Sequence, residues 1–459
     1  MQRLKISTNR RFLVFDDGTP FFWLGDTAWE LFHRLLDDEA EAYLENRRQK
    51  GFTVIQAVAL AEFDGLNTPN AYGERPLIGN DPLTPNEDYF RQVDRIIGLA
   101  QRKGLFVGLL PTWGDKVELL AHGKGPVIFN PDNARRYGEW IGRRYRDFEN
   151  IVWINGGDRS GGGTNAPIWH ALAQGIKTQD PNHLVTFHPS GGGDGHSSSE
   201  WFHDATWLDF NLAQSGHERR NLPNHELVSR DYQIVPAKPC LDGEPRYEDH
   251  PVNWKPAEFG YFDDYDARQA AYWAMFAGAF GHTYGCHPIW QMCGERYQPI
   301  AFARRSWREA MDLPGAAQMG HARRLIESRP MLERIPDQSL VARLGSGGEH
   351  IRGTRGGDYA FLYLPTGGAV RVRPRNVNGD RLCVWWFDPR SGGATELGVF
   401  DKRREMEFLA PTTGRSHDWV LVLEDASRGY SPPGSGAFRS TTSPRHPTSR
   451  SRAKEQVHE

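Results

Sequence analysis

The chain has 459 residues and a formal net charge of −3, from 55 basic and 58 acidic side chains. This balance argues against nucleic-acid binding, because basic residues gather only near the C-terminus. No run reaches the roughly 18 apolar residues of a membrane span, and four scattered cysteines without a CxxC pair argue against a disulfide framework or a zinc ribbon. The first residues lack an apolar signal core, so we expect a cytoplasmic location.

The first predicted element is an N-terminal β-hairpin within residues 1–20. Residues 11–19 contain a short apolar run followed by Asp17-Gly18, which is a strong signal for a tight hairpin turn. We expect this hairpin to cover the bottom of the domain that follows.

Between residues 21 and 330, short apolar runs alternate with longer amphipathic segments. Apolar runs without polar alternation are typical of strands buried on both faces, as in parallel sheets. The segments between them have helical periodicity, and two of them end at Gly51 and Gly104, which are helix-stopping residues. Eight such units predict an α/β fold, a (β/α)8 TIM barrel, and the absence of GxGxxG argues against a doubly wound sheet. The runs are residues 22–26, 53–58, 105–110, 151–155, 183–188, 208–212, 239–244 and 281–285.

The composition changes after residue 330. Short strand-like runs separated by Gly, Pro and Asp predict a small all-β sandwich over residues 331–425. These runs are residues 358–364, 369–372, 382–387, 406–409 and 419–423. Residues 426–459 are rich in Ser, Arg, Pro and Gly, and we expect a disordered tail there.

Polar and aromatic side chains follow most of the predicted barrel strands. In a TIM barrel the reacting groups lie at the C-terminal ends of the strands. Polar groups at these ends cost desolvation free energy unless they meet partners or a substrate, so we predict a binding site there. The predicted substrate-binding residues are Asp26, Trp29, Gln56, Trp113, His188, Gln214 and Trp290.

Two of the strand ends carry candidate catalytic carboxylates, Asp158 after the fourth run and Glu244 at the end of the seventh. Strands three apart in an eight-stranded ring face each other across the mouth, so the two groups can meet at one bond. Glycosidic cleavage needs such a pair, one carboxyl to protonate the leaving oxygen and one to meet the oxocarbenium-like carbon. Structural roles stay open for both: Asp158 could cap a helix or form a turn, and Glu244 could pair with Arg246.

Other chemistries have less support in the sequence. The chain has no GxSxG elbow, no HExxH pair and no P-loop lysine motif. His188, Asp194 and His196 surround a glycine-rich loop and could bind a metal, but a sugar-binding His188 beside a flexible loop is the simpler interpretation. We therefore predict a carbohydrate substrate, no metal and no cofactor.

Four segments resemble the apiosidase-like glycoside hydrolases of family 140, and together they cover the barrel end to end. They are FWLGDTAWE at 22–30, GFTVIQ at 51–56, WINGGD at 153–158 and DGEP at 242–245. Residues 335–424 are similar to the β-sandwich that often follows this barrel, sometimes labelled as collagen-binding. The resemblance implies a retaining mechanism with Asp158 as acid/base and Glu244 as nucleophile.

The resemblance also implies a substrate class, because the characterised activity of the family removes apiose, a branched pentofuranose, from plant pectin. We expect an exo-acting retaining hydrolase that cleaves a terminal apiose-like pentofuranose from plant oligosaccharides or glycosides. Gly157-Asp158 stands where larger barrel-glycosidase clans carry Asn-Glu, which argues against cellulase or mannanase activity. Two alternatives stay open: an arabinofuranosidase or other glycosidase on the same barrel, and a non-catalytic carbohydrate-binding protein.

Overall fold

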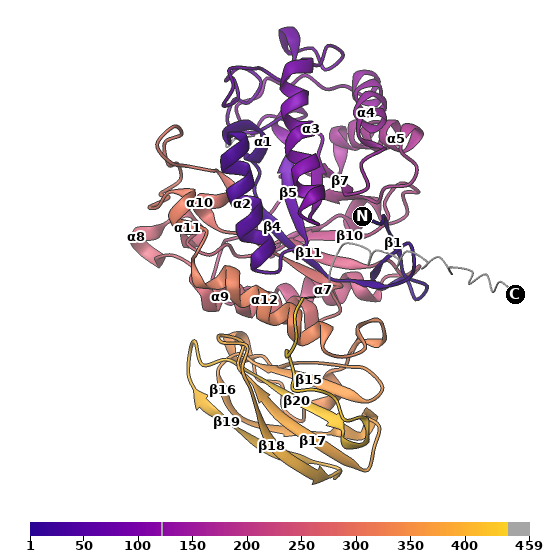
Figure 1. The fold of residues 1–459 in the computed structure, drawn as a ribbon, viewed down its shortest axis with the longest axis vertical. Helices are drawn as coiled ribbons and strands as arrows, with labels where there is room; N and C mark the ends of the chain where they lie inside the picture. The colour runs from indigo at the N-terminus through magenta and orange to yellow at the C-terminus, as the bar shows by residue number, and fades with distance from the viewer. Residues whose placement is uncertain (121–122, 439–459) are drawn as a thin grey trace, which may run out of the picture.

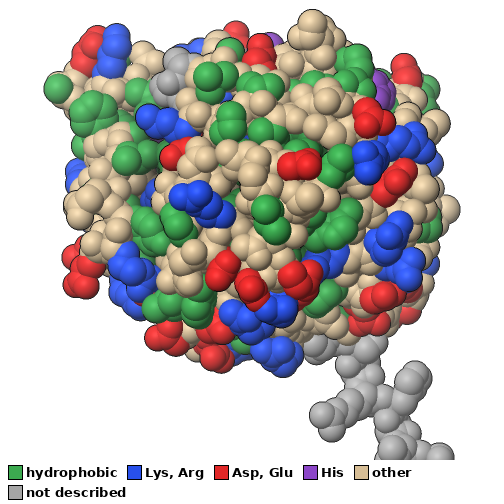
Figure 2. Space-filling view, turned by 90° about the horizontal axis from the view of Figure 1, so that it is seen from above, with side chains coloured by type: hydrophobic (Ala, Val, Ile, Leu, Met, Phe, Trp, Pro, Cys, Tyr) green, Lys and Arg blue, Asp and Glu red, His purple; other side chains and the backbone are tan. Residues whose placement is uncertain are grey.

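The computed structural model describes residues 1–120 and 123–438. It consists of a larger α/β domain and a C-terminal antiparallel β domain that lies below it in Figure 1. Most of the predicted disordered tail, residues 439–459, lies outside the described residues. On the face opposite the β domain, acidic and basic side chains are interspersed, as the balanced charge of the chain leads one to expect (Figure 2).

The chain begins with a small antiparallel sheet of three strands, β1 (Leu4–Ile6), β2 (Leu13–Phe15) and β3 (Pro20–Phe21). β2 and β3 pair around a turn in which Gly18 has a φ of 87°, a backbone conformation that favours glycine. The ring of Phe21 packs against Phe106, with centroids 5.1 Å apart, which anchors this sheet to a strand of the α/β domain.

Eight parallel strands of the described chain form the centre of the α/β domain, and each contains residues of one of the eight predicted runs. They are β4 (Trp23–Thr27), β5 (Val54–Val58), β6 (Phe106–Leu110), β7 (Ile151–Gly156), β8 (Val185–His188), β10 (Asn211–Gln214), β11 (Cys240–Glu244) and β12 (Gly281–Tyr284). Their residues are buried throughout, as apolar runs without alternation predict.

The parallel strands form a curled sheet in two hydrogen-bonded parts. One part has the order β12-β4-β5-β6-β7-β8, and the other pairs β11 with β10, against which β9 (His196–Ser197) lies antiparallel. Backbone hydrogen bonds also join the two parts next to these strands. The Asp209 amide donates to the Val185 carbonyl at 2.8 Å, and the Phe280 amide donates to the Cys240 carbonyl at 3.1 Å.

Helices connect the parallel strands and cover the outside of the sheet (Figure 1). The longer ones are α2 (Asp37–Gln49), α3 (Glu87–Arg102), α4 (Pro131–Tyr145), α5 (Ala166–Gln179), α7 (Asn224–Gln233), α9 (Asp264–Phe276) and α12 (Pro314–Glu327). The short ones are α1 (Leu31–Arg34), α6 (Ser199–Phe202), α8 (Pro256–Phe259), α10 (His287–Trp290) and α11 (Trp307–Ala310).

α3 illustrates how the sequence determines these helices. The Asn86 side chain accepts a hydrogen bond from the Asp88 amide and caps the N-terminus. Gly104, with a φ of 75°, follows the C-terminus of the helix. The apolar positions of the helix recur at helical spacing and are buried: Tyr89, Phe90, Val93, Ile96, Ile97 and Ala100. Within the described residues, no helix is both long and apolar enough to cross a membrane.

The C-terminal domain is antiparallel, with the sheet order β13-β14-β15-β20-β17-β18 and a second sheet of β16 and β19. The strands are β13 (Ile335–Pro336), β14 (Arg352–Arg355), β15 (Tyr359–Leu364), β16 (Gly367–Val372), β17 (Arg381–Phe387), β18 (Ala394–Asp401), β19 (Met406–Thr413) and β20 (Trp419–Asp425). Leu362, Trp386 and Leu421 belong to its buried core. β18 lay outside the predicted strands because it is largely exposed and carries no burial pattern.

A buried ion pair connects the two domains. Arg268 of α9 donates to both carboxylate oxygens of Asp418, at 3.0 and 2.9 Å, and both residues are almost fully buried. Beside it the rings of Tyr272 and Tyr363 stack with centroids 4.8 Å apart. The β domain is thus packed firmly against α9 and α12, the helices above it in Figure 1.

We expect Arg268→Ala to lower the free energy of unfolding by about 3–5 kcal/mol, because Asp418 would stay buried without its partner. Urea unfolding monitored by tryptophan fluorescence measures this loss. The matched control is Arg371→Ala, which removes an exposed ion pair with Glu407 and should cost less than about 1 kcal/mol. Equal effects of the two changes would contradict the role assigned to the buried pair.

Residues 426–438, which the sequence assigns to the tail, contact the folded chain. The Tyr430 hydroxyl donates to Asp358 at 2.9 Å, and the Arg329 guanidinium lies 4.6 Å from the Tyr430 ring centroid. The guanidinium groups of Arg323 and Arg324 each lie 5.1 Å from the ring centroid of Phe438. Two aromatic residues therefore hold a segment whose polar composition predicts disorder.

Candidate active site

A cavity of about 420 Å³ opens where the parallel strands end. Its walls come from the segments that follow β4, β5, β6, β7, β10, β11 and β12, so nearly every strand contributes to it. The lining residues are Trp29, Arg34, Glu62, Phe63, Trp113, Lys124, Asp158, His217, Glu244, Tyr247, His250, Trp254, Trp290, Ile300 and Ala301. Arg34 also lines a neighbouring cavity of about 250 Å³. The carboxylate in that second cavity, Glu39, already forms ion pairs with Arg296 and Arg308.

A tight turn after β7 positions Asp158. Gly156, Gly157 and Asp158 follow one another with φ values of 93°, 114° and 55°. A Cβ atom at Gly157 would lie 2.8 Å from the Trp113 ring, so this position requires glycine. A left-handed conformation at a non-glycine residue costs about 1–3 kcal/mol and is typical of functional sites. The backbone is therefore strained where it holds this carboxyl in the cavity.

Two histidines hold Glu244 at the end of β11. His188 Nε2 lies 3.0 Å from one carboxylate oxygen, and His217 Nε2 lies 3.1 Å from the other. His188 Nδ1 lies 3.0 Å from the carbonyl oxygen of Pro189, which can only accept, so Nδ1 carries a proton. Because Nε2 faces a carboxylate, the arrangement favours a proton on both ring nitrogens, and His188 is then a cation beside Glu244.

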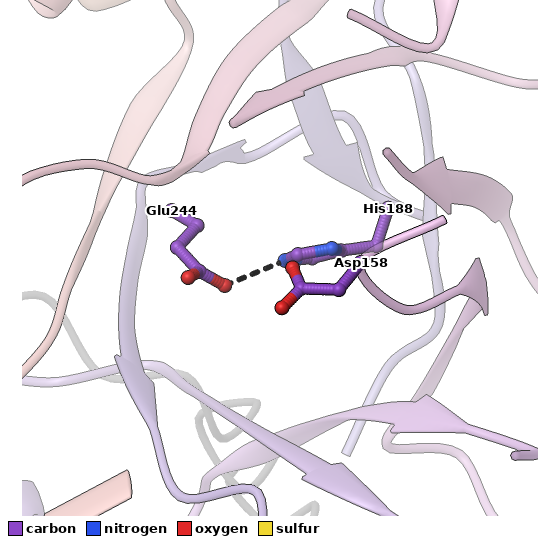
Figure 3. A group of neighbouring side chains, drawn as sticks. All are labelled: Asp158, His188 and Glu244. Atoms are coloured by element: carbon purple, nitrogen blue, oxygen red, sulfur yellow. Dashed lines mark ion pairs between the residues drawn. The ribbon is translucent and has the colours of Figure 1, made fainter. Parts of the chain in front are cut away.

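The candidate carboxylates lie close together. An oxygen of Asp158, a nitrogen of His188 and an oxygen of Glu244 all lie within 4.8 Å of one another. In Figure 3, Asp158 and His188 lie side by side across from Glu244, with the ion pair between His188 and Glu244 drawn as a dashed line. The turn after β7 and the end of β11 thus bring two acids to one point of the cavity.

The surroundings separate the pKa values of the two acids. Burial, followed by the negative charge of Glu244, raises the pKa of Asp158 to about 6, although His188, Gln214 and Arg159 partly oppose the rise. Burial also acts to raise the pKa of Glu244, but the contacts with His188 and His217 outweigh it and lower that pKa to about 2. In weakly acidic solution one carboxyl is protonated while the other is ionised, as a general acid and a nucleophile require.

Comparisons with known proteins show the family of the chain. The model of the apiosidase-like catalytic domain matches residues 7–333. The chain belongs to the apiosidase-like family. A second model, described as "Putative collagen-binding domain of a collagenase", matches residues 335–424 of this apiosidase-like protein.

Two solved structures are similar to the apiosidase-like chain over nearly their whole length. One, titled "Glycoside hydrolase", is 35% identical with a TM-score of 0.85, and the match covers 94% of this chain and 98% of that one. The other, a glycoside hydrolase family 5 protein from Bacteroides vulgatus, is 31% identical with a TM-score of 0.86, covering 96% and 97%. No curated protein matches the sequence. The protein is therefore a glycoside hydrolase.

Five of the seven predicted substrate-binding residues of this hydrolase lie at or beside the cavity. Trp29, Trp113 and Trp290 line it, and the rings of Trp29 and Trp113 have centroids 5.2 Å apart. His188 lies beside Glu244, and the Gln214 side chain is close enough to Asp158 to lower its pKa. The aromatic walls suit the apolar faces of a sugar ring.

The structure does not bring Asp26 and Gln56 to the cavity. Asp26 accepts hydrogen bonds from Arg47 at 2.5 Å and Tyr43 at 2.6 Å, which tie β4 to α2. Gln56 donates to the Gly243 carbonyl at 3.2 Å and so connects β5 with β11. Both residues stabilise the sheet, and the strand-end rule that selected them could not distinguish this role from substrate binding.

Of the structural roles left open, the turn at Asp158 is observed, whereas the helix cap at Asp158 and the ion pair between Glu244 and Arg246 are not observed in the described residues. Within residues 1–120 and 123–438, Asp158 caps no helix: it occupies the left-handed turn after β7. Arg246 donates instead to the Leu222 carbonyl at 2.7 Å and to Gln269 at 3.2 Å, and it makes no ion pair with Glu244 in this part of the chain.

The cavity also contains residues that were not among the predicted substrate-binding residues. His217 contacts Glu244, and its ring stacks on His250 with centroids 4.1 Å apart. Tyr247 lies close enough to Glu244 for that charge to raise the pKa of its phenol, second to burial. These side chains follow β10 and β11 within the loops, so a search extended a few residues beyond the strand ends could have found them.

Asp158, His188 and Glu244 offer possible ligand atoms for a metal ion, and the geometry does not test the expected absence of a metal. The three side chains lie close enough together to hold an ion. His188 Nδ1 faces the Pro189 carbonyl and Nε2 faces the Glu244 carboxylate, so His188 in its doubly protonated form has no lone pair to offer a metal.

His188, Asp194 and His196 are the other possible metal site in the sequence. In the structure Asp194 pairs with Arg219, and His196 contacts Glu200. These contacts do not direct either side chain toward His188.

Proposed function

We propose that this glycoside hydrolase is retaining and exo-acting, and that it removes a terminal pentofuranose, apiose in the first place, from plant oligosaccharides or glycosides. The observation that carries the mechanism is the close approach of Asp158 and Glu244, whose oxygens lie within 4.8 Å of each other. Retaining enzymes place their carboxyl groups about 5–5.5 Å apart, whereas inverting enzymes need roughly 6.5–9.5 Å to admit a water.

We also infer that the two parts of the parallel sheet close into the predicted (β/α)8 barrel. The backbone hydrogen bonds of Asp209 to Val185 and of Phe280 to Cys240 support closure on both sides of the β10–β11 pair. Closure gives one mouth at the carboxyl ends of the strands, where active sites of this fold lie.

In the proposed mechanism Asp158 protonates the leaving oxygen while Glu244 attacks the anomeric carbon, which gives a covalent glycosyl-enzyme. Asp158, now ionised, removes a proton from water, and the water releases the sugar with retained configuration. His188 and His217 keep Glu244 ionised and fix the directions of its oxygens. The two histidines thereby prepare the nucleophile before substrate arrives.

The substrate class rests on the family match together with the cavity. The apiosidase-like description supports a branched pentofuranose as the first candidate. A volume of about 420 Å³ with walls of Trp29, Trp113 and Trp290 suits a terminal sugar and the start of its aglycone. The arabinofuranosidase alternative fits the same walls, so it is the main competitor.

A panel of aryl pentofuranosides tests the sugar assignment. We expect kcat/KM on the apiofuranoside to exceed that on the arabinofuranoside by at least about tenfold, since a pocket shaped for one sugar discriminates against a close analogue to this degree or more. Preference for the arabinofuranoside would favour the alternative hydrolase. Binding of these sugars without hydrolysis of any of them would support a non-catalytic carbohydrate-binding protein.

We expect kcat/KM to fall as the pH rises through about 6. Asp158 must be protonated to act as the acid, and its pKa is raised to about 6, so the proton is present below that pH and lost above it. The pKa of Glu244 is lowered to about 2, so the nucleophile stays ionised across the whole acidic range. A pH profile of kcat/KM measures both limbs, and an optimum well above neutrality would contradict the assignment.

The positive charge of His188 should affect the pH of both limbs of the kcat/KM profile. It lowers the pKa of Asp158 and that of Glu244, so His188→Gln should move both limbs to higher pH and reduce the maximal rate. His225→Gln is the control, because His225 stacks on His350, with ring centroids 4.4 Å apart, and does not line the cavity. Limbs that stay in place in His188→Gln would refute the electrostatic role.

A further inference from the structure

A third acid, Glu62, lies in the same cavity as Asp158 and Glu244 but has no part in the mechanism above. It follows β5 and is only 8% exposed. Within the described chain, no hydrogen bond or ion pair holds its carboxyl group. A carboxyl group that lines a cavity without a protein partner can form hydrogen bonds with a ligand that enters the cavity.

Two nearby cations, Lys116 and Arg34, are engaged elsewhere. The Lys116 ammonium donates to Asp115 at 2.7 Å and to the Ala61 carbonyl at 2.5 Å. The Arg34 guanidinium donates to the Gln291 carbonyl at 2.6 Å and lies 3.4 Å from Glu30. In the described chain Glu62 therefore forms no salt bridge with these cations, and its carboxyl group can bind a molecule that enters the cavity.

The protonation state of Glu62 suits hydroxyl binding. Burial, followed by the charges of Asp158, Glu30 and Asp115, raises the pKa of Glu62 well above its usual range. A neutral carboxyl has both a donor and an acceptor, which match the two hydrogen-bonding roles of a hydroxyl group. Next to it, the Phe63 ring lies 5.3 Å from that of Trp290, so an apolar wall adjoins this polar group.

The position of Glu62 indicates which part of a substrate it meets. Glu62 and Asp158 line the same cavity, and Asp158 is the neighbouring charge that raises the pKa of Glu62 most. In the proposed mechanism Asp158 protonates the oxygen of the leaving group. We propose that Glu62 determines aglycone specificity by binding a hydroxyl group of the leaving-group sugar. This inference rests on the proposed function, because it takes Asp158 as the acid. The ligand class is a hydroxylated aglycone, a sugar or polyol, rather than an apolar aryl group.

The test compares two leaving groups on whichever pentofuranose the wild type cleaves, a hexose and nitrophenol. Glu62→Leu should lower kcat/KM about 10- to 100-fold more on the disaccharide than on the nitrophenyl glycoside, which has no aglycone hydroxyl. Glu62→Gln keeps a donor and an acceptor and should recover most of the loss. Asp231→Asn is the control: this buried carboxyl binds Ser197 and Ser199 away from the cavity, so any effect should be equal on both substrates.

Equal losses on both substrates in Glu62→Leu, or a Gln variant as impaired as the Leu variant, would overturn the proposal. Binding of the disaccharide by calorimetry in a Glu244→Gln background gives a readout that needs neither turnover nor retention. There, adding Glu62→Leu should weaken the affinity at least about tenfold, and an unchanged Kd would also overturn it. Failure of the proposed function is distinguishable, because it appears in the wild type as an inverted product or as binding without hydrolysis.

Discussion

Replacing Glu244 with Gln is expected to lower kcat by about 100,000-fold or more on every substrate, the scale on which losing a covalent nucleophile acts. The amide has nearly the same shape but cannot form the glycosyl-enzyme, so the leaving group should make no difference. Steady-state kinetics on a nitrophenyl glycoside and on a disaccharide measure the loss.

Glu248→Gln is the matched control for this variant. Glu248 is also buried, with a pKa raised to about 7 mainly by burial, but its carboxylate accepts from the Tyr284 hydroxyl at 2.5 Å and does not line the cavity. It should retain activity within about tenfold of wild type, because it lies outside the site. A folded Glu244→Gln protein with rates near those of this control would remove Glu244 from the mechanism.

Replacing Asp158 with Ala is expected to have an effect that depends on the leaving group. A general acid contributes about 100- to 10,000-fold, so alkyl and sugar glycosides should lose that much in kcat/KM. A dinitrophenyl glycoside should lose far less, because its leaving group departs without a proton. Added azide should restore turnover by attacking the glycosyl-enzyme without a general base, and the limb of the pH profile near 6 should disappear.

The absence of any leaving-group dependence in Asp158→Ala would contradict the acid/base role. Two other results would also contradict this role. Azide could leave the rate on the activated substrate unchanged, or the glycosyl azide product could have inverted configuration. The comparison with Glu244→Gln serves as the internal control, because the two variants should differ in their response to the leaving group although the two acids lie within 4.8 Å of each other.

The parallel sheet was predictable because its strands are buried on both faces. A run such as Val54–Val58 needs no polar position, and the pattern is visible without knowledge of its neighbours. The antiparallel domain was less predictable, since β14 and the exposed β18 depend on pairing with strands remote in sequence. Residues 426–438 were assigned to a tail because contacts made by single aromatic residues, such as Tyr430, leave no periodic signal.

The two acids of the candidate site could be predicted from the sequence, whereas several other residues that line the cavity could not. The sequence places Asp158 and Glu244 at the ends of predicted strands, and the structure brings both to the wall of one cavity. Asp26 stands at such an end too, but Arg47 and Tyr43, remote in sequence, hold it against α2. Other wall residues, such as Trp254 with a φ of 58°, lie in loops whose left-handed backbone depends on tertiary packing, so the sequence does not reveal where they lie.

Anomeric configuration tests the central claim most directly, the claim that Asp158 and Glu244 act in turn on one sugar carbon. Proton NMR of the methyl glycoside formed when the wild type acts in dilute methanol records the configuration in a product that does not mutarotate. We predict the configuration of the substrate, with no such product from Glu244→Gln. A methyl glycoside of opposite configuration would mean a single displacement and would contradict the account.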